Sequence, residues 1–416
     1  MLYNDFCGEK ISRLGFGLMR LPMMDVPATA AKIIDQSQVQ AMVDYALESG
    51  VNYFDTAWPY HGGLSELAIG EAMAKHPRDS YYLANKYPGH QTAPSYDPAA
   101  IFEKQLAKCK VEYFDFYLLH NVNEGCFDVY KDERWGIVDY FVEQRNAGRI
   151  KHLGFSTHAR AENLEEILDY LDKKIPGGPE FCQIQMNYLD WTLQEAKEKY
   201  EILERRGIPA IIMESVRGGK LADLGEERNA QLKALRPDES IASWSFRWLQ
   251  QFDNNRVILS GMSNMDQMID NVKTFSGAPT SCTSTAASAA EEKHQAGALT
   301  SSENELLLAL AEEMKDSVPC TACRYCVDGC PMQLDIPMLL RSYNDRKFQD
   351  SFTVSIHMEA LPEDRRPDAC IRCGACAKIC PQRIDVPRYL EDFAQLLKDG
   401  CSWDAVCKER AKQLTR

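Results

Sequence analysis

Segments with the pattern of buried strands alternate with helix-like segments eight times in roughly the first 275 residues, and this alternation restricts the fold more than any other feature. The strand-like segments are short apolar runs bounded by turn residues, and a longer stretch of helical periodicity follows each of them. The predicted strands cover residues 14–18, 52–55, 81–86, 114–120, 151–156, 182–187, 209–213 and 256–261. Eight such units in a segment of this length are typical of a closed (β/α)8 barrel. We therefore predict an α/β fold with this barrel over residues 1–275.

An open, doubly wound sheet is the main alternative to a closed barrel. Such a sheet normally carries a glycine-rich turn directly after its first strand, where a dinucleotide phosphate binds. The Gly15-x-Gly17 pair of this chain lies inside the first predicted strand instead. The closed barrel is therefore favoured. Residues 3–13 predict a short hairpin that turns at Gly8 and covers the barrel floor.

Length and charge restrict the partners and the compartment. The chain of 416 residues is too long for one ordinary domain, and its 61 acidic residues outnumber its 47 basic ones. This excess of negative charge disfavours nucleic acid and anionic membrane as partners. The N-terminal residues lack the pattern of a signal peptide, and no apolar run is long enough to span a bilayer. We expect a soluble, cytoplasmic protein.

Four polar residues stand at or just beyond the ends of consecutive predicted strands: Asp55, Tyr60, Lys86 and His120. Because the reactive face of such a barrel lies at the carboxyl ends of its strands, we expect these side chains to converge. Each of them alone also fits a structural role, as a turn acid, a loop aromatic, a solvated lysine or a packed histidine. Their occurrence at successive strand ends favours a catalytic set.

The four side chains match the needs of carbonyl reduction. Hydride transfer leaves negative charge on the carbonyl oxygen, so a proton donor must lie beside it. A tyrosine has a reference pKa of about 10, and a nearby ammonium lowers this pKa and makes the phenol a better donor. A carboxylate can hold the ammonium in place, and an imidazole can orient the carbonyl or relay the proton.

The motifs around these residues resemble, in order, those of the aldo-keto reductases. They are Asp55-Thr56-Ala57-x-x-Tyr60, Asn85-Lys86, Leu118-Leu119-His120 and Gly154-Phe155-Ser156. The resemblance covers nearly all of residues 10–275. It implies a TIM barrel that binds NAD(P)H without a Rossmann fold, with Tyr60 as proton donor, Lys86 and Asp55 tuning it and His120 orienting the substrate.

The same resemblance assigns contacts to the nicotinamide nucleotide. Ser156 and Gln183 match the positions that hold the nicotinamide carboxamide, and Met213 stands where the family stacks an aromatic ring. The residues at the adenosine end are Gly261, Ser263, Gln267 and Asn271. Family members that prefer NADP usually carry an arginine near Gln267, so its absence here leaves NADH or dual use open.

Two cysteine runs near the C-terminus predict a metal module. Each run has three cysteines at Cys-x-x-Cys-x-x-Cys spacing and a fourth before a proline: Cys320, Cys323, Cys326 and Cys330, then Cys370, Cys373, Cys376 and Cys380. This spacing lets three thiolates bind one cubane while the fourth reaches the other cluster. We therefore predict two [4Fe–4S] clusters, the first held by the first three cysteines of its run with Cys380, and the second by those of its run with Cys330. Zinc sites and disulfides are the alternatives that this spacing disfavours.

The module is an internal repeat, because prolines and aspartates recur at a constant offset after both runs. It resembles the mainly α-helical dicluster ferredoxin-like domain, which we assign to residues 304–416. Residues 276–303 are rich in Ser, Thr, Ala and Gly and predict a flexible linker. The pairing of barrel and module resembles a bacterial group of aldo-keto reductase-like proteins with a C-terminal 4Fe–4S domain.

The expected function is that of a pyridine-nucleotide-dependent oxidoreductase that reduces a small aldehyde or ketone, or oxidises an alcohol. Nicotinamide transfers two electrons as a hydride, whereas each cluster passes one electron, so an electron-transfer protein is a possible partner. The alternative function is an iron–sulfur electron-transfer or redox-sensing protein whose barrel serves mainly as a nucleotide-binding or docking platform.

Overall fold

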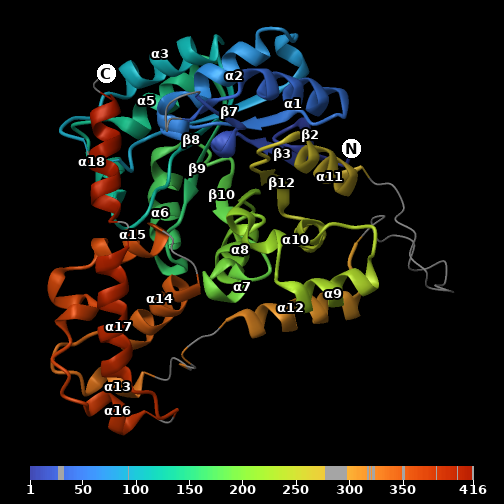
Figure 1. The fold of residues 1–416 in the computed structure, drawn as a ribbon. Helices are drawn as coiled ribbons and strands as arrows, with labels where there is room; N and C mark the ends of the chain where they lie inside the picture. Colours follow the sequence, from blue (N-terminus) through green and yellow to red (C-terminus); the bar gives the residue numbers. More distant parts are fainter. Residues whose placement is uncertain are drawn as a thin grey trace.

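The computed structural model describes residues 1–26, 32–91, 93–276, 298–315, 318, 320, 324–348, 352–380, 382–400 and 402–414. Parallel strands close into a barrel in which each strand pairs with the next along the chain, and the last pairs with the first (Figure 1). The strands are β3 (Leu14–Gly17), β6 (Tyr53–Asp55), β7 (Tyr82–Tyr87), β8 (Phe114–Leu119), β9 (Ile150–Thr157), β10 (Cys182–Gln185), β11 (Ala210–Met213) and β12 (Asn255–Ser260). The predicted (β/α)8 barrel is confirmed.

The inside of the barrel is filled with aromatic and aliphatic side chains rather than left as a channel. Tyr53, Phe116 and Leu118 belong to this inner cluster, and so does Phe6 from the hairpin of β1 (Tyr3–Phe6) and β2 (Glu9–Ser12). The rings of Phe6 and Phe116 stack with centroids 5.1 Å apart. The hairpin thus plugs the floor, and the opposite rim, where the strands end, stays available for a site.

Helices cover the outside of the barrel in the expected alternation. They are α1 (Gln36–Glu48), α2 (Ser65–Met73), α3 (Pro98–Cys109), α5 (Ile137–Asn146), α6 (Ala161–Lys174), α8 (Ala196–Arg205), α10 (Ile241–Gln250) and α11 (Met265–Phe275). Helix α6 illustrates the reason, because Leu164, Ile167, Leu168 and Leu171 recur at helical spacing and are all buried. Smaller elements were not predicted from the sequence: β4 (Met23–Asp25), β5 (Lys32–Ile34), α4 (Phe127–Lys131), α7 (Asp190–Leu193) and α9 (Glu226–Leu235).

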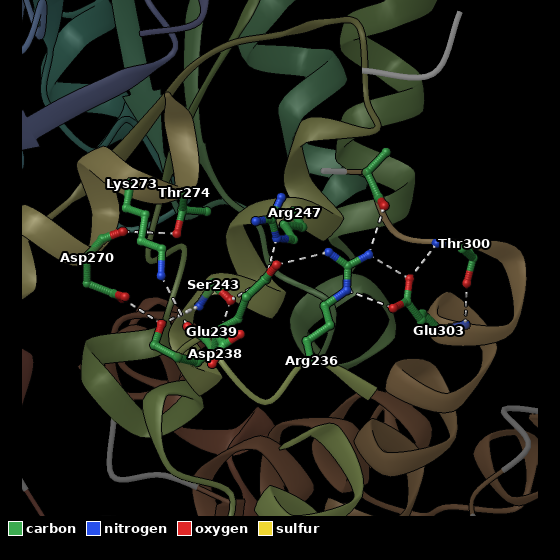
Figure 2. A network of polar contacts seen from close by, with 12 residues as sticks. Arg236, Asp238, Glu239, Ser243, Arg247, Asp270, Lys273, Thr274, Thr300 and Glu303 are labelled. Carbon is green, nitrogen blue, oxygen red and sulfur yellow. Dashed lines mark hydrogen bonds and ion pairs between the residues drawn. The ribbon is translucent and has the colours of Figure 1, made fainter. Parts of the chain in front are cut away.

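Helix α12 (Ser301–Met314) belongs to the barrel by its packing, since Leu307 and Leu310 are part of the large hydrophobic core outside the strands. Thr300 and Glu303 form a capping box at its start. Figure 2 shows that Glu303 also forms an ion pair with Arg236, whose Nε donates to Glu303 Oε1 over 2.7 Å. The structure therefore places α12 with the barrel core, whereas the boundary expected at residue 304 assigns this helix to the cysteine module. Most of the expected linker, residues 277–297, lies outside the described residues.

The C-terminal domain is helical, as predicted, and has a core of its own. Its elements are α13 (Tyr325–Asp328), α14 (Ile336–Phe348), α15 (Phe352–Ala360), α16 (Ala375–Ile379), α17 (Val386–Asp399) and α18 (Trp403–Leu414). Leu339 and Leu340 of α14 pack with Leu390 and Phe393 of α17 in this core. In Figure 1, α13 and α16 lie at the end of the domain away from the barrel, and α14, α15 and α18 lie nearer to it. Within the described residues, no helix is both long and apolar enough to cross a membrane.

Polar contacts join the C-terminal domain to the barrel. The guanidinium of Arg217, which follows β11, lies 2.7 Å from Asp345 Oδ1 of α14, and it also pairs with Asp190. These three side chains are all at least nine-tenths buried. His357 Nε2 of α15 donates to the carbonyl oxygen of His158 over 2.7 Å. The two domains therefore meet through buried charge and specific hydrogen bonds.

Candidate functional site

Three of the predicted catalytic residues form one connected group at the barrel rim. Asp55 ends β6, Lys86 lies near the end of β7, and Tyr60 opens the short 3₁₀ helix η2 (Tyr60–Gly63). Lys86 Nζ lies 2.5 Å from Asp55 Oδ1, 2.8 Å from the carbonyl oxygen of Thr56 and 3.4 Å from Tyr60 Oη. The barrel register brings these strand ends together, because Asp55 pairs with Ala84 on β7.

The charge state of Lys86 follows from its neighbours. Its side chain is fully buried, which lowers the pKa, but Asp55 and Tyr60 outweigh burial and the pKa of Lys86 is raised. The group is therefore an ammonium held between a carboxylate and a phenol. Its position 4.9 Å from the centroid of the Tyr60 ring adds a cation–π contact.

The pKa of Tyr60 moves in the direction opposite to the one expected from the ammonium alone. Lys86 does lower this pKa, as predicted, but burial raises it by more, and the pKa of Tyr60 is raised. The phenol therefore keeps its proton at neutral pH. A protonated phenol beside an ammonium can give up this proton when negative charge develops on a nearby oxygen.

His120 follows β8 and faces the same group. Its ring centroid lies 6.1 Å from that of Tyr60, in an edge-to-face arrangement. Burial lowers the pKa of His120 well below 6.5, and the charges of neighbouring groups lower it further, so the imidazole is neutral. Among the described residues, its Nδ1 has no hydrogen-bond partner. All four predicted catalytic residues thus lie together.

His90 is a functional candidate that the sequence reasoning did not select. It follows β7 by a few residues, is 4% exposed, and its ring centroid lies 4.3 Å from that of His120. Burial lowers its pKa to about 3, so this imidazole is also neutral. Its position shortly after the strand that ends near Lys86 is the one sequence signal for it.

One cavity of about 540 Å³ opens at the rim of the barrel. Asp55, Tyr60 and His120 line it on one side. The candidate nucleotide contacts all line it as well: Ser156, Gln183, Met213, Gly261, Ser263, Gln267 and Asn271. The structure therefore places the proposed proton donor and the proposed coenzyme contacts around the same space.

The hydrogen bonds within the protein show which of the candidate nucleotide contacts can still donate or accept another hydrogen bond. Gln183 Oε1 is buried and has no partner among the described residues. Ser156 Oγ accepts from the backbone N–H of Asn121 over 2.8 Å, and its hydroxyl proton can still be donated. A carboxamide, which both donates and accepts, fits this pair. Gln267 Oε1 instead accepts from the backbone N–H of Ser263 over 2.8 Å.

The cysteines of the C-terminal domain gather around two small cavities. Cys320, Cys326 and Cys380 line the first, and the second is lined by Cys330, Cys370, Cys373 and Cys376. This grouping is the crossed one that the spacing predicts, with the last cysteine of each run beside the other run. Cys323 lies outside the described residues. Cys320, Cys330, Cys370, Cys373, Cys376 and Cys380 are free thiols rather than disulfides, which suits a set of thiolate ligands.

The C-terminal domain also contributes to the barrel cavity, which the sequence did not indicate. Phe352 and Thr353 of α15 and Trp403 and Arg410 of α18 line it. The indole of Trp403 stacks on His90 with centroids 5.7 Å apart and an angle of 20° between the planes. The cavity is therefore built by both domains.

Comparisons with known proteins agree with this arrangement. Residues 13–290 match the model of the aldo/keto reductase family, and residues 319–384 match a 4Fe–4S dicluster domain. A probable aldo-keto reductase of Glycine max is 30% identical over 158 residues, which are 36% of this chain and 42% of that protein. An NADH-specific methylglyoxal reductase of Escherichia coli is 24% identical over 277 residues, 56% of this chain and 82% of that protein.

A solved structure gives the same fold. An aldo-keto reductase from Bacillus halodurans superposes with a TM-score of 0.54 at 23% identity, over 74% of this chain and 96% of that one. The family match covers more than half of the chain, and it spans the barrel that carries Asp55, Tyr60, Lys86 and His120. The chain belongs to the aldo/keto reductase family and carries a C-terminal 4Fe–4S dicluster domain.

Proposed function

We propose that the protein is an NAD(P)H-dependent oxidoreductase that reduces an aldehyde or ketone, or oxidises the corresponding alcohol, with Tyr60 as the general acid or base. One observation carries this proposal. The ammonium of Lys86 contacts both Asp55 Oδ1 and Tyr60 Oη at the edge of the 540 Å³ cavity. A buried phenol beside a buried ammonium is costly to maintain for stability alone, and it suits proton transfer to a carbonyl oxygen.

Each residue has a defined part in the proposed reduction. When bound, the nicotinamide nucleotide supplies the hydride. Tyr60 donates its phenolic proton to the carbonyl oxygen as negative charge develops there, and Lys86 stabilises the phenolate that remains. Asp55 and the carbonyl oxygen of Thr56 keep the ammonium in position. The neutral ring of His120, with Nδ1 unpaired among the described residues, orients the carbonyl oxygen.

The nucleotide contacts suit a nicotinamide ring and an adenosine end. Gln183 Oε1 can accept from the carboxamide N–H, and the hydroxyl of Ser156 can donate to its oxygen. Gly261, Ser263, Gln267 and Asn271 line the cavity at the start of α11. Because Gln267 is neutral and bonds to Ser263, we propose that NADH is accepted at least as well as NADPH.

The C-terminal domain is proposed to hold two [4Fe–4S] clusters for electron transfer. The crossed grouping of the thiols around two cavities supports this assignment. Protein isolated without oxygen should contain about eight iron and about eight acid-labile sulfide per chain. Two zinc ions per chain and no sulfide would refute it.

The test of the catalytic proposal is Tyr60→Phe, which removes the acidic proton and keeps the ring. We expect carbonyl reduction by NADH or NADPH to fall by about 100-fold or more, because general acid catalysis typically contributes about 10²–10⁴. Tyr45→Phe is the matched control, since Tyr45 lies on α1 and does not line the cavity. Equal rates for Tyr60→Phe and the unchanged protein would refute the role of Tyr60.

The placement of α13 and α16 favours a second candidate function. These helices, which carry cluster cysteines, lie at the end of the domain away from the barrel (Figure 1). Such a position suits electron exchange with a partner protein, and the barrel would then be mainly a nucleotide-binding platform. Electron paramagnetic resonance of the anaerobic protein after addition of NADH separates the two cases. Reduced clusters without carbonyl turnover in a substrate screen would favour the second function.

A further inference from the structure

Helix α18 and the start of α15 close one side of the barrel cavity, although both follow the last barrel strand, which ends at Ser260, by more than 90 residues. Phe352, Trp403 and Arg410 all line the cavity beside His90 and His120. The end of the cavity near the proton donor is therefore enclosed by the iron–sulfur domain. Residues of that domain therefore lie around the same cavity as Tyr60.

A continuous set of ring contacts fixes this wall. Phe352 stacks on Trp403 with centroids 5.3 Å apart, and Trp403 stacks on His90 at 5.7 Å. His90 in turn contacts His120 at 4.3 Å. Helix α18 is held further by the thiol of Cys407, which is buried and lies 3.8 Å from the carbonyl oxygen of His90. The wall thus has a defined position relative to the reactive groups.

Arg410 brings a permanent positive charge to this wall. Its guanidinium lies 5.6 Å from the centroid of the Trp403 ring. Its charge contributes to the lowered pKa values of both His90 and His120, which places its field at the reactive end. The two histidines are neutral there. A guanidinium has five N–H donors, so it can bind a carboxylate while keeping another contact.

The acidic groups of the cavity do not oppose an anion at this wall. Asp55 is paired with Lys86 at 2.5 Å, and Asp270 accepts from Ser240 Oγ at 2.5 Å. Glu214 follows β11, and burial raises the pKa of its carboxyl, which favours the neutral form. A planar carboxylate can accept two parallel hydrogen bonds from a guanidinium, and a guanidinium also packs on aromatic rings.

We propose that the iron–sulfur domain forms part of the substrate site, and that Arg410, beside Trp403, binds a carboxylate on the carbonyl substrate. This inference rests on the proposed reductase function and adds the substrate class to it: short aldehydes or ketones that carry a carboxylate. Arg410 is then a specificity-determining residue that the C-terminal domain supplies to the barrel of the same chain.

The test compares matched substrate pairs with the full-length, cluster-loaded protein under anaerobic conditions. The pairs are 4-oxobutanoate with butanal, and 4-carboxybenzaldehyde with benzaldehyde. We expect the unchanged protein to prefer the carboxylate member of each pair in kcat/KM by at least about 10-fold. Arg410→Gln should reduce this preference by about 10- to 100-fold, because a hydrogen-bonded charge pair is lost. Arg410→Lys, which keeps the charge, should retain part of the preference.

Two controls keep the test interpretable. Lys408→Gln removes a charge on the exposed face of the same helix, where Lys408 pairs with Asp404, and should leave the preference unchanged. Far-UV circular dichroism and cluster absorbance verify that each variant is folded and loaded. Calorimetric titration with succinate, which is not reduced, measures carboxylate binding without turnover, and the Kd should rise by about 10-fold or more in Arg410→Gln.

The outcomes separate the two proposals. Turnover without a carboxylate preference, or a preference that Arg410→Gln leaves unchanged, overturns the role of Arg410 and leaves the reductase function standing. Succinate binding that depends on Arg410, with no turnover of any carbonyl, overturns the reductase function and supports the carboxylate site.

Discussion

Among single residues, Lys86 has the environment with the largest consequences for both stability and chemistry. It is fully buried, and its ammonium is satisfied by Asp55, by the carbonyl oxygen of Thr56 and by Tyr60. Removing one member of a buried ion pair leaves an uncompensated charge, whereas removing both can be nearly neutral. The pair thus allows stability and catalysis to be measured separately.

Lys86→Met should lower the free energy of unfolding by about 3–5 kcal/mol, because it leaves Asp55 buried without a counter-charge. The double variant Lys86→Met/Asp55→Leu should recover most of this stability in a urea titration. Carbonyl reduction should stay at least about 100-fold low in both variants, because neither stabilises the phenolate of Tyr60. Recovery of activity in the double variant would exclude a role for the ammonium in the reaction.

His90 predicts a pH dependence of stability. Its pKa is about 3 in the folded chain and about 6.5 when unfolded, so between these values the unfolded state binds more protons. The contribution of His90 to the free energy of unfolding should therefore be fully present above pH 6.5. It should fall by up to about 1.4 kcal/mol for each pH unit below 6.5. In His90→Gln, the slope of urea midpoint against pH should be shallower from pH 6.5 to 5. Identical slopes would show that His90 protonates freely in the folded protein.

At the scale of elements, one glutamate links α12 to the barrel in addition to the buried leucines of this helix. Glu303 closes the capping box with Thr300 and pairs with Arg236, while Arg236 also contacts Glu239 (Figure 2). The side chains of Arg236 and Glu303 are 12% and 10% exposed, so solvent screens this pair less than a surface pair. Helix docking and helix capping are therefore linked through the same side chain.

Glu303→Ala should cost about 2–5 kcal/mol of stability, the sum of a lost cap and a lost charged hydrogen bond. Limited proteolysis should cleave α12 faster in this variant, because its first turn loses both restraints. Glu305→Ala, an exposed position on the same helix, is the matched control and should change neither measurement. Equal rates of proteolysis in the two variants would show that the contacts of Glu303 do not restrain the first turn of α12.

At the scale of the whole molecule, a buried ion pair between Arg217 and Asp345 connects the iron–sulfur domain to the barrel. Arg217 begins the short 3₁₀ helix η4 (Arg217–Ala222) after β11, with a backbone φ of 46°, and it bridges Asp190 of the barrel and Asp345 of α14. The left-handed backbone of a non-glycine residue persists only when its surroundings favour it. The ion pairs of Arg217 with Asp190 and Asp345 are the contacts that favour this conformation.

Asp345→Ala should loosen the docked domain without unfolding it, because the core around Leu340 and Phe393 is separate. Hydrogen exchange in α14 and α18 should become faster by about 10-fold or more, and kcat/KM for carbonyl reduction should fall as the cavity wall moves. Iron content should stay unchanged. Arg341→Gln removes the half-exposed pair with Glu195 and is expected to have little effect. Unchanged exchange in Asp345→Ala would place the docking energy elsewhere.

The amino-acid sequence by itself determined the features that depend on local pattern. The alternation of strands and helices, the polar residues at strand ends and the spacing of the cysteines were all readable, because each depends on neighbours close in the chain. The convergence of Asp55, Tyr60, Lys86 and His120 followed from barrel geometry once the strands were identified.

Only the tertiary structure decided the properties that depend on burial and on contacts distant in sequence. The pKa of Tyr60 is raised because burial outweighs the effect of the ammonium, and only the structure shows this balance. Helix α12 packs on the barrel because its buried leucines belong to the barrel core. The wall formed by Trp403 and Arg410 had no local signal, since it arises where two separately encoded domains pack together. Side-chain patterns encode which face of an element is buried, but not which distant element buries it.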